Sequence, residues 1–233
     1  MTKKMKIWIG AIIVLTVSLL VAYNTISGSI ILKIPFKGTT VILDESKKVT
    51  TKENNEIVEF SSLSANHSII VSKEGYFPWT KKIKLERNAS VTLSPIFVSQ
   101  SPSGAIITSA DPEYRKIINQ IRNDILPTET NPKISSDKTT RLWILNNTIF
   151  VADESTTTAV TNPETEITHV SFYKDRSDVV IFSTGNGVYM IETGKNDTQN
   201  FMPIYFGLEP NFVENDSNSI FVEDNNSLMQ VAI

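Results

Sequence analysis

Residues 169–191 read HVSFYKDRSDVVIFSTGNGVYMI, and this stretch decides the fold class of the C-terminal half of the chain. Its β-branched and aromatic residues fall into short runs at 169–172, 179–182 and 188–191, separated by a charged segment and by a Thr-Gly-Asn-Gly turn. Short apolar runs bounded by turn residues predict β-strands. Asn186–Gly187 suits a two-residue hairpin turn, which needs positive φ. The stretch therefore predicts a repeating unit of strand, tight turn and strand.

The same pattern returns forty residues later. The matching pairs are Phe172 with Phe212, Asp175 with Asn215, Ser177 with Ser217, and Ile181 with Phe221, and Asn225–Asn226 takes the place of the turn. An earlier, less regular copy spans 142–152. Units of this kind with a period near 40 are typical of propeller blades. Since closed propellers typically need four or more blades and about three units are present, we predict a partial, propeller-like β-repeat domain over 134–233.

An open array of this kind leaves strand edges without a partner. The last run, 227–233, alternates apolar residues on one face and ends the chain. We therefore expect this edge to pair with a second copy or with a partner protein that adds a strand.

Residues 99–133 are predicted to be a linker that contains one helix. The Ser/Pro-rich stretch 100–104 is typical of a linker. Asp111-Pro112-Glu113 predicts a helix start with Asp111 as the N-cap, and Pro127 ends the helix. One apolar stripe is formed by Tyr114, Ile117, Ile118, Ile121 and Ile125. We expect this stripe to pack on the following β domain rather than to bind a partner.

Residues 27–98 read as a series of short strands. The runs are 29–34, 40–43, 56–60, 67–72, 81–85 and 90–93, each rich in β-branched residues and bounded by Gly, Pro, Asn or Ser. Their spacing predicts a compact antiparallel β-sandwich.

Two stretches carry a resemblance to a known family. Residues 34–44, IPFKGTTVILD, resemble the opening of a PEGA domain, in which a Pro and a Gly precede a strand that ends in Asp. Residues 67–79, HSIIVSKEGYFPW, are similar to its second signature, a His-led strand that runs into Gly-Tyr-x-Pro-Trp. Glu45 stands where the family has Gly, and Ala65-Asn66-His67 replaces its Gly-x-His turn. The resemblance covers 28–95 and implies a small β-sandwich of exported, membrane-anchored prokaryotic proteins, generally without catalysis of its own. The C-terminal repeats resemble the WD40-like repeats that accompany PEGA domains, although they lack the Gly-His and Trp-Asp marks.

The N-terminal stretch 7–23, IWIGAIIVLTVSLLVAY, begins a segment without charge that extends to Leu32. Lys3, Lys4 and Lys6 precede it, and Trp8 and Tyr23 flank it. The pattern predicts a transmembrane signal anchor over 7–26, a cytoplasmic tail over 1–6, and a body outside the cell membrane. The alternative is a cleaved signal peptide.

Composition excludes some functions. The chain has no cysteine, so it has no disulfide or thiolate chemistry, which suits a prokaryotic envelope protein. The net charge of −3 is uneven, because residues 33–90 carry a net +3 and residues 91–233 a net −9. The acidic distal half argues against nucleic acid as a partner.

Few residues suggest a site. Tyr76, Phe77 and Trp79 are predicted either to be core residues or to form an aromatic surface for a ligand such as a sugar. The two histidines, His67 and His169, fall in different domains, and no catalytic, cofactor or metal motif is recognisable. The acid- and Asn-rich turns 215–218 and 223–226 lack the spacing of a calcium loop.

We therefore predict a protein that is not an enzyme and has no cofactor: a membrane-anchored envelope protein that presents β domains for protein contacts, including self-association, or for surface structure. One alternative is a receptor for a cell-wall glycan or small molecule. Another is the sensor half of an enzyme or signalling system, although six predicted cytoplasmic residues leave no room for a signalling domain and no catalytic set is visible in the sequence.

Overall fold

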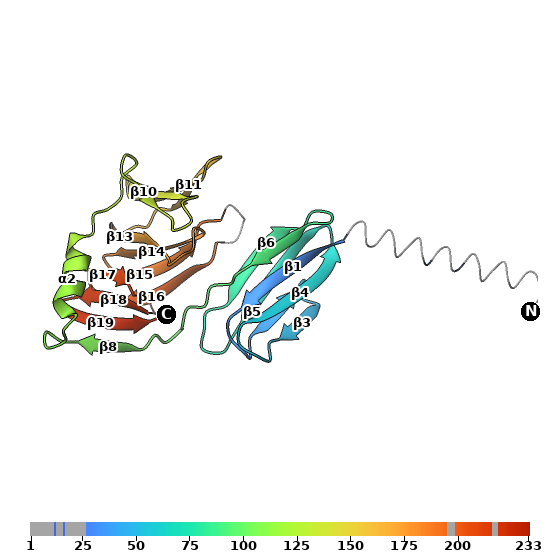
Figure 1. Cartoon of the computed structure of the whole chain (residues 1–233), viewed down its shortest axis with the longest axis horizontal. Coiled ribbons are helices and arrows are strands. Elements are labelled where there is room, and N and C mark those ends of the chain that lie inside the picture. Colours follow the sequence, from blue (N-terminus) through green and yellow to red (C-terminus); the bar gives the residue numbers. More distant parts are fainter. Residues whose placement is uncertain (1–11, 13–15, 17–26, 195–198, 216–218) are drawn as a thin grey trace, which may run out of the picture. The chain divides into compact units, whose positions relative to one another are not determined.

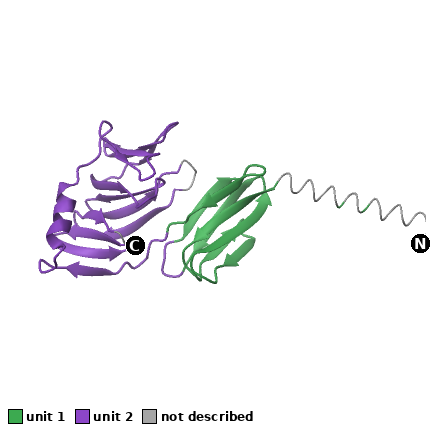
Figure 2. Cartoon of the chain, in the orientation of Figure 1, with its two compact units in different colours: residues 1–73, 78–96 green, residues 74–77, 97–233 purple. Residues whose placement is uncertain are grey.

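The computed structural model describes residues 12, 16, 27–194, 199–215 and 219–233. They form two compact units, residues 1–73 with 78–96 and residues 74–77 with 97–233 (Figure 2). Both units are built mainly of β-strands, as predicted (Figure 1). In the part of the chain described here, no helix is both long enough and apolar enough to cross a membrane. The predicted anchor at 7–26 lies outside the described residues, apart from Ile12 and Thr16.

Unit 1 contains two β-sheets. Strands β1 (Ser27–Ile34), β4 (Glu56–Leu63) and β7 (Ser90–Leu93) form a sheet in the order β4-β1-β7, in which β1 and β7 are parallel. Strands β2 (Thr40–Leu43), β3 (Lys47–Thr50), β5 (Asn66–Ser72) and β6 (Trp79–Lys84) form the second sheet in the order β3-β2-β5-β6. Alternate residues are buried in β2, β4, β5, β6 and the second half of β1, among them Ile30, Leu32 and Ile34 of β1, which are at most 1% exposed.

Hydrogen bonds of Asp44 with His67 and Ser68 connect the turn that ends β2 to strand β5. Asp44 and Glu45 both have positive φ, at 50° and 58°. The Asp44 carboxylate accepts a hydrogen bond from the Ser68 backbone N–H (2.9 Å) and lies 2.6 Å from Nδ1 of His67. Nε2 of His67 lies 2.8 Å from the Leu63 carbonyl oxygen. The buried imidazole therefore has a structural partner on each ring nitrogen.

Unit 2 contains three four-stranded antiparallel sheets. The first repeat sheet holds β9 (Lys133–Ile134), β10 (Arg141–Leu145), β11 (Thr148–Ala152) and β12 (Thr157–Thr161). The second holds β13 (Ile167–Phe172), β14 (Val179–Thr184), β15 (Gly187–Glu192) and β16 (Phe201–Phe206). The third holds β17 (Asn211–Glu214), β18 (Ser219–Asp224), β19 (Ser227–Ala232) and β8 (Gly104–Ile107).

The predicted repeat is confirmed between the second and third sheets. Strands β18 and β19 begin and end 40 residues after β14 and β15, with Ser219 against Val179 and Ser227 against Gly187. The predicted match of Ser217 to Ser177 lies outside the described residues. No closed barrel or propeller is formed by the part of the chain that the structure describes.

Strand β8 corrects two predictions. Residues 104–107 were predicted to lie within the linker 99–133, yet they pair antiparallel with β19, with Gly104 opposite Val231 and Ile107 opposite Leu228. The final strand β19 therefore lies between β18 and β8 and does not present the unpaired edge that we expected. The reason is that 104–107 is an uncharged apolar segment whose partner lies at the far end of the chain. The segment 97–133 accordingly belongs to unit 2.

The hairpin turns follow the prediction only in part. Asn146–Asn147 has φ values of 49° and 59°, and Asn225–Asn226 has 47° and 61°, which is the pattern of a two-residue hairpin turn. Thr184 pairs with Gly187, so the turn of the central repeat consists of Gly185 and Asn186. Asn186 does not have positive φ, and the prediction of an Asn186–Gly187 turn was wrong.

Helix α2 spans Tyr114–Asn123 and packs on the third repeat sheet. Ile117, Ile118 and Ile121 are buried in one cluster with Leu228 of β19, which confirms the predicted packing of the stripe. Ile125 lies past the end of the helix and is 78% exposed, so its predicted place in the stripe was wrong. Asp111 does not cap the helix either, because its carboxylate accepts the Thr108 backbone N–H instead, and the N-cap position is Glu113.

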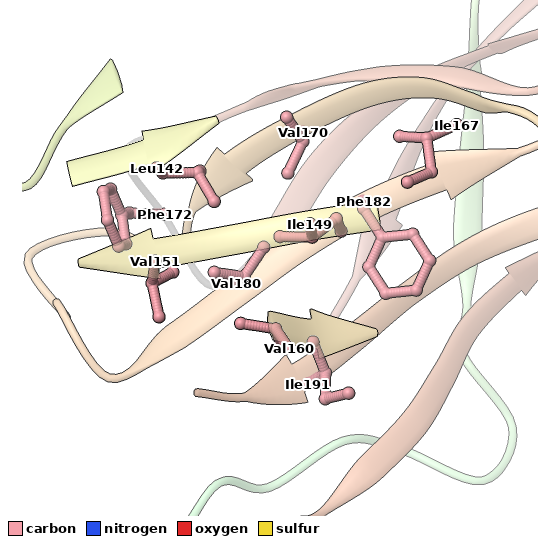
Figure 3. Close-up of a cluster of buried hydrophobic side chains, with 10 residues drawn as sticks. All are labelled: Leu142, Ile149, Val151, Val160, Ile167, Val170, Phe172, Val180, Phe182 and Ile191. Atoms are coloured by element: carbon pink, nitrogen blue, oxygen red, sulfur yellow. The ribbon is translucent and has the colours of Figure 1, made fainter. Parts of the chain in front are cut away.

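The largest core cluster of unit 2 joins the first and second repeat sheets (Figure 3). It contains Leu142, Ile149, Val151, Val160, Ile167, Val170, Phe172, Val180, Phe182 and Ile191, all at most 6% exposed. These apolar residues come from strands of both sheets and interlock, so the two sheets form one packed body.

Candidate functional site

Unit 2 presents two candidate sites, on opposite edges of its second repeat sheet. The first, which we call the aromatic edge, consists of Tyr189, Phe201, Phe206 and Leu208. The Phe201 ring stacks on the Tyr189 ring at 5.2 Å, and the Phe206 ring meets Tyr189 edge-on at 6.3 Å. Phe201, Phe206 and Leu208 are 52%, 71% and 74% exposed. Large apolar side chains gathered on an edge strand mark a surface suited to contacts with other molecules.

A carboxylate of the third repeat sheet holds the aromatic edge in place. Asp224 accepts hydrogen bonds from the Tyr205 hydroxyl (2.8 Å) and from the Leu208 backbone N–H (3.0 Å). Burial and the Asp224 carboxylate together raise the pKa of Tyr205 to about 12. Between these two donors lies Gly207, where a Cβ atom would come within 2.1 Å of the Asp224 carboxylate. Residue 207 must therefore be glycine for Asp224 to accept both hydrogen bonds.

The second site, the inner pocket, lies where one edge strand from each repeat sheet meets the end of helix α2. It has a volume of about 300 Å³. Its lining comes from α2 and the residue after it (Gln120, Asn123, Asp124), from β9 (Lys133), from β13 (His169, Ser171) and from β17 (Phe212, Val213, Glu214). Concave sites with a few convergent polar groups are the usual places for small ligands.

Asp124 is paired with two groups in this pocket. One of its oxygens, Oδ2, lies 2.6 Å from Nζ of Lys133 and 2.6 Å from Nε2 of His169. Lys133 also donates to the Val170 carbonyl oxygen at 2.8 Å. Burial opposes ionisation of Asp124, but the hydrogen bonds from His169 and Lys133 prevail and lower its pKa to about 2.

Glu214 is held differently. Both of its carboxylate oxygens face the Lys174 backbone N–H, at 3.3 and 3.2 Å, and no lysine or arginine forms an ion pair with it among the described residues. Burial raises the pKa of Glu214, against the opposing effects of the Lys174 N–H and of the charges on Lys133 and Lys174. Among the described residues, the pocket therefore contains one carboxylate in close ion pairs and one carboxylate that forms none.

The geometry of the polar side chains in the pocket can be compared with that of known catalytic and metal sites. Ser171 lines the pocket with His169, but within the described part of the chain no hydrogen bond joins the two side chains as a nucleophile and base would require. No group of three or more histidine, aspartate or glutamate side chains among the described residues is placed to hold a metal ion.

The predicted aromatic ligand surface does not form a single exposed face. Trp79 is 2% exposed and lies in the core of unit 1, as the core alternative predicted for it. Tyr76 and Phe77 are half-buried, and Tyr76 makes an edge-on contact with Phe97 at 6.0 Å. A ligand surface at Tyr76 and Phe77 stays a prediction.

Sequence reasoning missed the residues of both candidate sites except His169. The run Phe201–Phe206, FMPIYF, is a short continuous stretch of apolar and aromatic residues that could have marked a strand. Glu214 lies 40 residues after Lys174, to whose backbone N–H its carboxylate is bonded, so the repeat period itself pairs these two positions. Asp124 and Lys133 carried no sequence signal of their own.

Comparison of the sequence with protein-family models found no match, and comparison with curated proteins found none either.

Proposed function

We propose that this protein is a non-catalytic, membrane-anchored protein of the cell envelope that presents its β units for contacts with other proteins. The observation that carries the proposal is the aromatic edge, because Phe201 and Phe206 of the edge strand β16, and Leu208 just after it, expose 52–74% of their surface. Interfaces are enriched in aromatic side chains at their centres. The charge-free segment at 7–26, with Lys3, Lys4 and Lys6 before it and no basic residue after it until Lys33, supports the anchor and the placement of the body outside the cell membrane.

The finer assignment of the fold belongs to the same proposal. The two sheets of unit 1 are consistent with a PEGA-like sandwich over 27–98, to which the stretches 34–44 and 67–79 are similar. The three four-stranded sheets of unit 2 support a partial, propeller-like array in which β8 supplies the fourth strand of the last sheet. Folds of this kind on exported proteins fit an interaction role, but the fold itself does not specify a partner.

The test uses the full chain in membranes of cells that produce it. Chemical crosslinking of the wild type should yield a defined crosslinked species, and the double variant Phe201→Ser/Phe206→Ser should lose it. Ile57→Ser is the matched control, because Ile57 is 64% exposed but belongs to unit 1. If the double variant retains the species as fully as the control, the aromatic edge does not carry the contact. Sedimentation of the purified chain then separates self-association from a different partner.

The inner pocket favours a second function, a receptor for a cell-wall glycan or another small molecule. Its residues come from three sheets and a helix and offer hydrogen-bonding groups of several kinds around a concave surface. Binding of glycan fragments and small solutes by the full chain, measured by calorimetry, tests this function, and loss of binding on substitution of pocket residues would locate it.

A further inference from the structure

We propose that the inner pocket binds a small ligand that carries a protonated primary amine, with the Glu214 carboxylate as its counter-ion. This inference rests on the receptor function proposed above and adds the chemical class of the ligand.

The first argument is the imbalance between the two carboxylates of the pocket. Asp124 is satisfied by Lys133 and His169, both at 2.6 Å. Among the described residues, Glu214 accepts only the Lys174 backbone N–H, at 3.2–3.3 Å, which is long for a hydrogen bond to a carboxylate. A half-buried carboxylate with so little compensation costs free energy, and a bound cation would remove that cost. The raised pKa of Glu214 is consistent with the same imbalance.

The second argument concerns the sign of the ligand's charge. Lys133 is the one lysine or arginine in the described lining of the pocket, and its ammonium group is already engaged by Asp124 and the Val170 carbonyl oxygen. An anionic ligand would meet two carboxylates and a cation that is not free to turn towards it. A cationic ligand would meet the Glu214 carboxylate, which forms no ion pair with a lysine or arginine among the described residues and is offset only by the Lys174 N–H and by the charges of Lys133 and Lys174.

The third argument separates an amine from a metal ion. Calcium takes six to eight oxygen ligands, and the described residues contain no group of three or more acidic or histidine side chains placed for a metal. An ammonium group needs only a few acceptors for its three N–H donors. Gln120, Asn123 and Ser171 are then available for the polar substituents of the ligand, and Val213 offers apolar contact. A volume of about 300 Å³ limits the ligand to a small molecule.

Three four-carbon probes of equal length test the proposal: 1,4-diaminobutane, 1,4-butanediol and succinate, titrated by calorimetry into the full chain in detergent. We expect the diamine to bind and the neutral and anionic probes not to bind. Glu214→Gln keeps the shape of the side chain and removes its charge, and it should weaken diamine binding by about tenfold or more. Glu164→Gln, an equal change of charge at an exposed position of the same unit, should leave binding unchanged. Thermal melting verifies that both variants are folded.

The outcomes distinguish failure of the proposed amine ligand from failure of the receptor function on which it rests. If the diol or succinate binds while the diamine does not, the pocket is a receptor site but the amine class is wrong. If the diamine binds equally well to Glu214→Gln, Glu214 is not the counter-ion and the proposal is overturned. If none of the three probes nor any glycan fragment binds at millimolar concentration, both the amine ligand and the receptor function are refuted.

Discussion

Gly207 offers the sharpest test of how the aromatic edge is built. In Gly207→Ala the new Cβ atom would lie 2.1 Å from Oδ2 of Asp224 and 2.5 Å from the Tyr205 ring. Real Cβ atoms essentially never approach other atoms so closely, so the Asp224 carboxylate must move. Moving it breaks the hydrogen bonds from Tyr205 (2.8 Å) and from the Leu208 N–H (3.0 Å).

The magnitude follows from those two bonds. A hydrogen bond to a charged group contributes roughly 1.5–3 kcal/mol, and partial exposure of this site places each bond near the low end. We therefore expect Gly207→Ala to lower the free energy of unfolding by roughly 2–4 kcal/mol. Gly185→Ala is the matched control. It lies in a turn close by, and a Cβ there would meet nothing within 4 Å, so its cost should stay below about 0.5 kcal/mol.

The assay is urea unfolding of the full chain followed by circular dichroism, with hydrogen exchange of residues 201–224 to locate the change. A double-mutant cycle with Asp224→Ala isolates the clash. Once Asp224 is shortened, adding Gly207→Ala should cost less than it does in the wild type, because the carboxylate and both of its hydrogen bonds are already gone and only the contact with the Tyr205 ring remains. Additive effects in the cycle, or equal stability of Gly207→Ala and Gly185→Ala, would refute the inference that a Cβ atom at residue 207 displaces the Asp224 carboxylate.

Three further predictions concern other parts of the chain. Ile121→Ala should cost roughly 2–4 kcal/mol in chemical unfolding, because Ile121 is 3% exposed, whereas Ile125→Ala should be nearly neutral; similar costs would contradict the observed end of α2. Gly75 has φ of +80° with open space around it, so Gly75→Val should cost roughly 1–3 kcal/mol from backbone strain alone, and an unchanged melting temperature would exclude that strain. The paired Asp124 stabilises the fold above its unfolded pKa near 3.8, and this contribution disappears as the pH falls through the folded pKa of about 2. The wild type should therefore lose more stability than Asp124→Asn between pH 4 and pH 2, and equal losses in acid melts would argue against the Lys133 and His169 pairs.

Most strands of unit 1 could be predicted because apolar residues in the sequence occupy the buried positions of the strands. Residues 40–43 and 90–93 were predicted with the bounds that β2 and β7 have. Strand β3 was missed because all four of its residues, Lys47 to Thr50, are exposed on an edge, where no apolar alternation is needed. Its backbone pairs with β2 through hydrogen bonds that a pattern of side chains does not reveal.

In unit 2 the strands were predicted from the 40-residue repeat, and the strands that depart from this repeat were missed. Strands β18 and β19 were found by comparison with β14 and β15, but β8 precedes the repeats in the chain and joins the last sheet from outside the pattern. The predicted apolar stripe of α2 wrongly included Ile125, because helical spacing alone did not show that the helix ends at Asn123.

The inner pocket was beyond prediction for a related reason. Asp124, Lys133, His169 and Glu214 come from four separate elements or their ends, and only the convergence of three sheet edges brings them together. Each residue alone is an ordinary charged or polar side chain near the end of a strand or helix. No spacing in the sequence distinguishes Asp124 or Lys133 from the other charged residues of the distal half, and the 40-residue period relates Glu214 only to Lys174.

The two candidate sites should act independently, because they lie on opposite edges of the second repeat sheet. The pocket uses β13 and the aromatic edge uses β16, with β14 and β15 between them. Three strand spacings of about 4.8 Å place these edges roughly 14 Å apart. All six residues of β14 are buried, so the intervening sheet is a packed element rather than a hinge. At such separations the effects of substitutions usually add. Glu214→Gln should therefore leave crosslinking at the aromatic edge unchanged, and Phe201→Ser/Phe206→Ser should leave diamine binding unchanged. A cross-effect larger than about threefold, or roughly 0.65 kcal/mol, would show that the sheet couples the two sites.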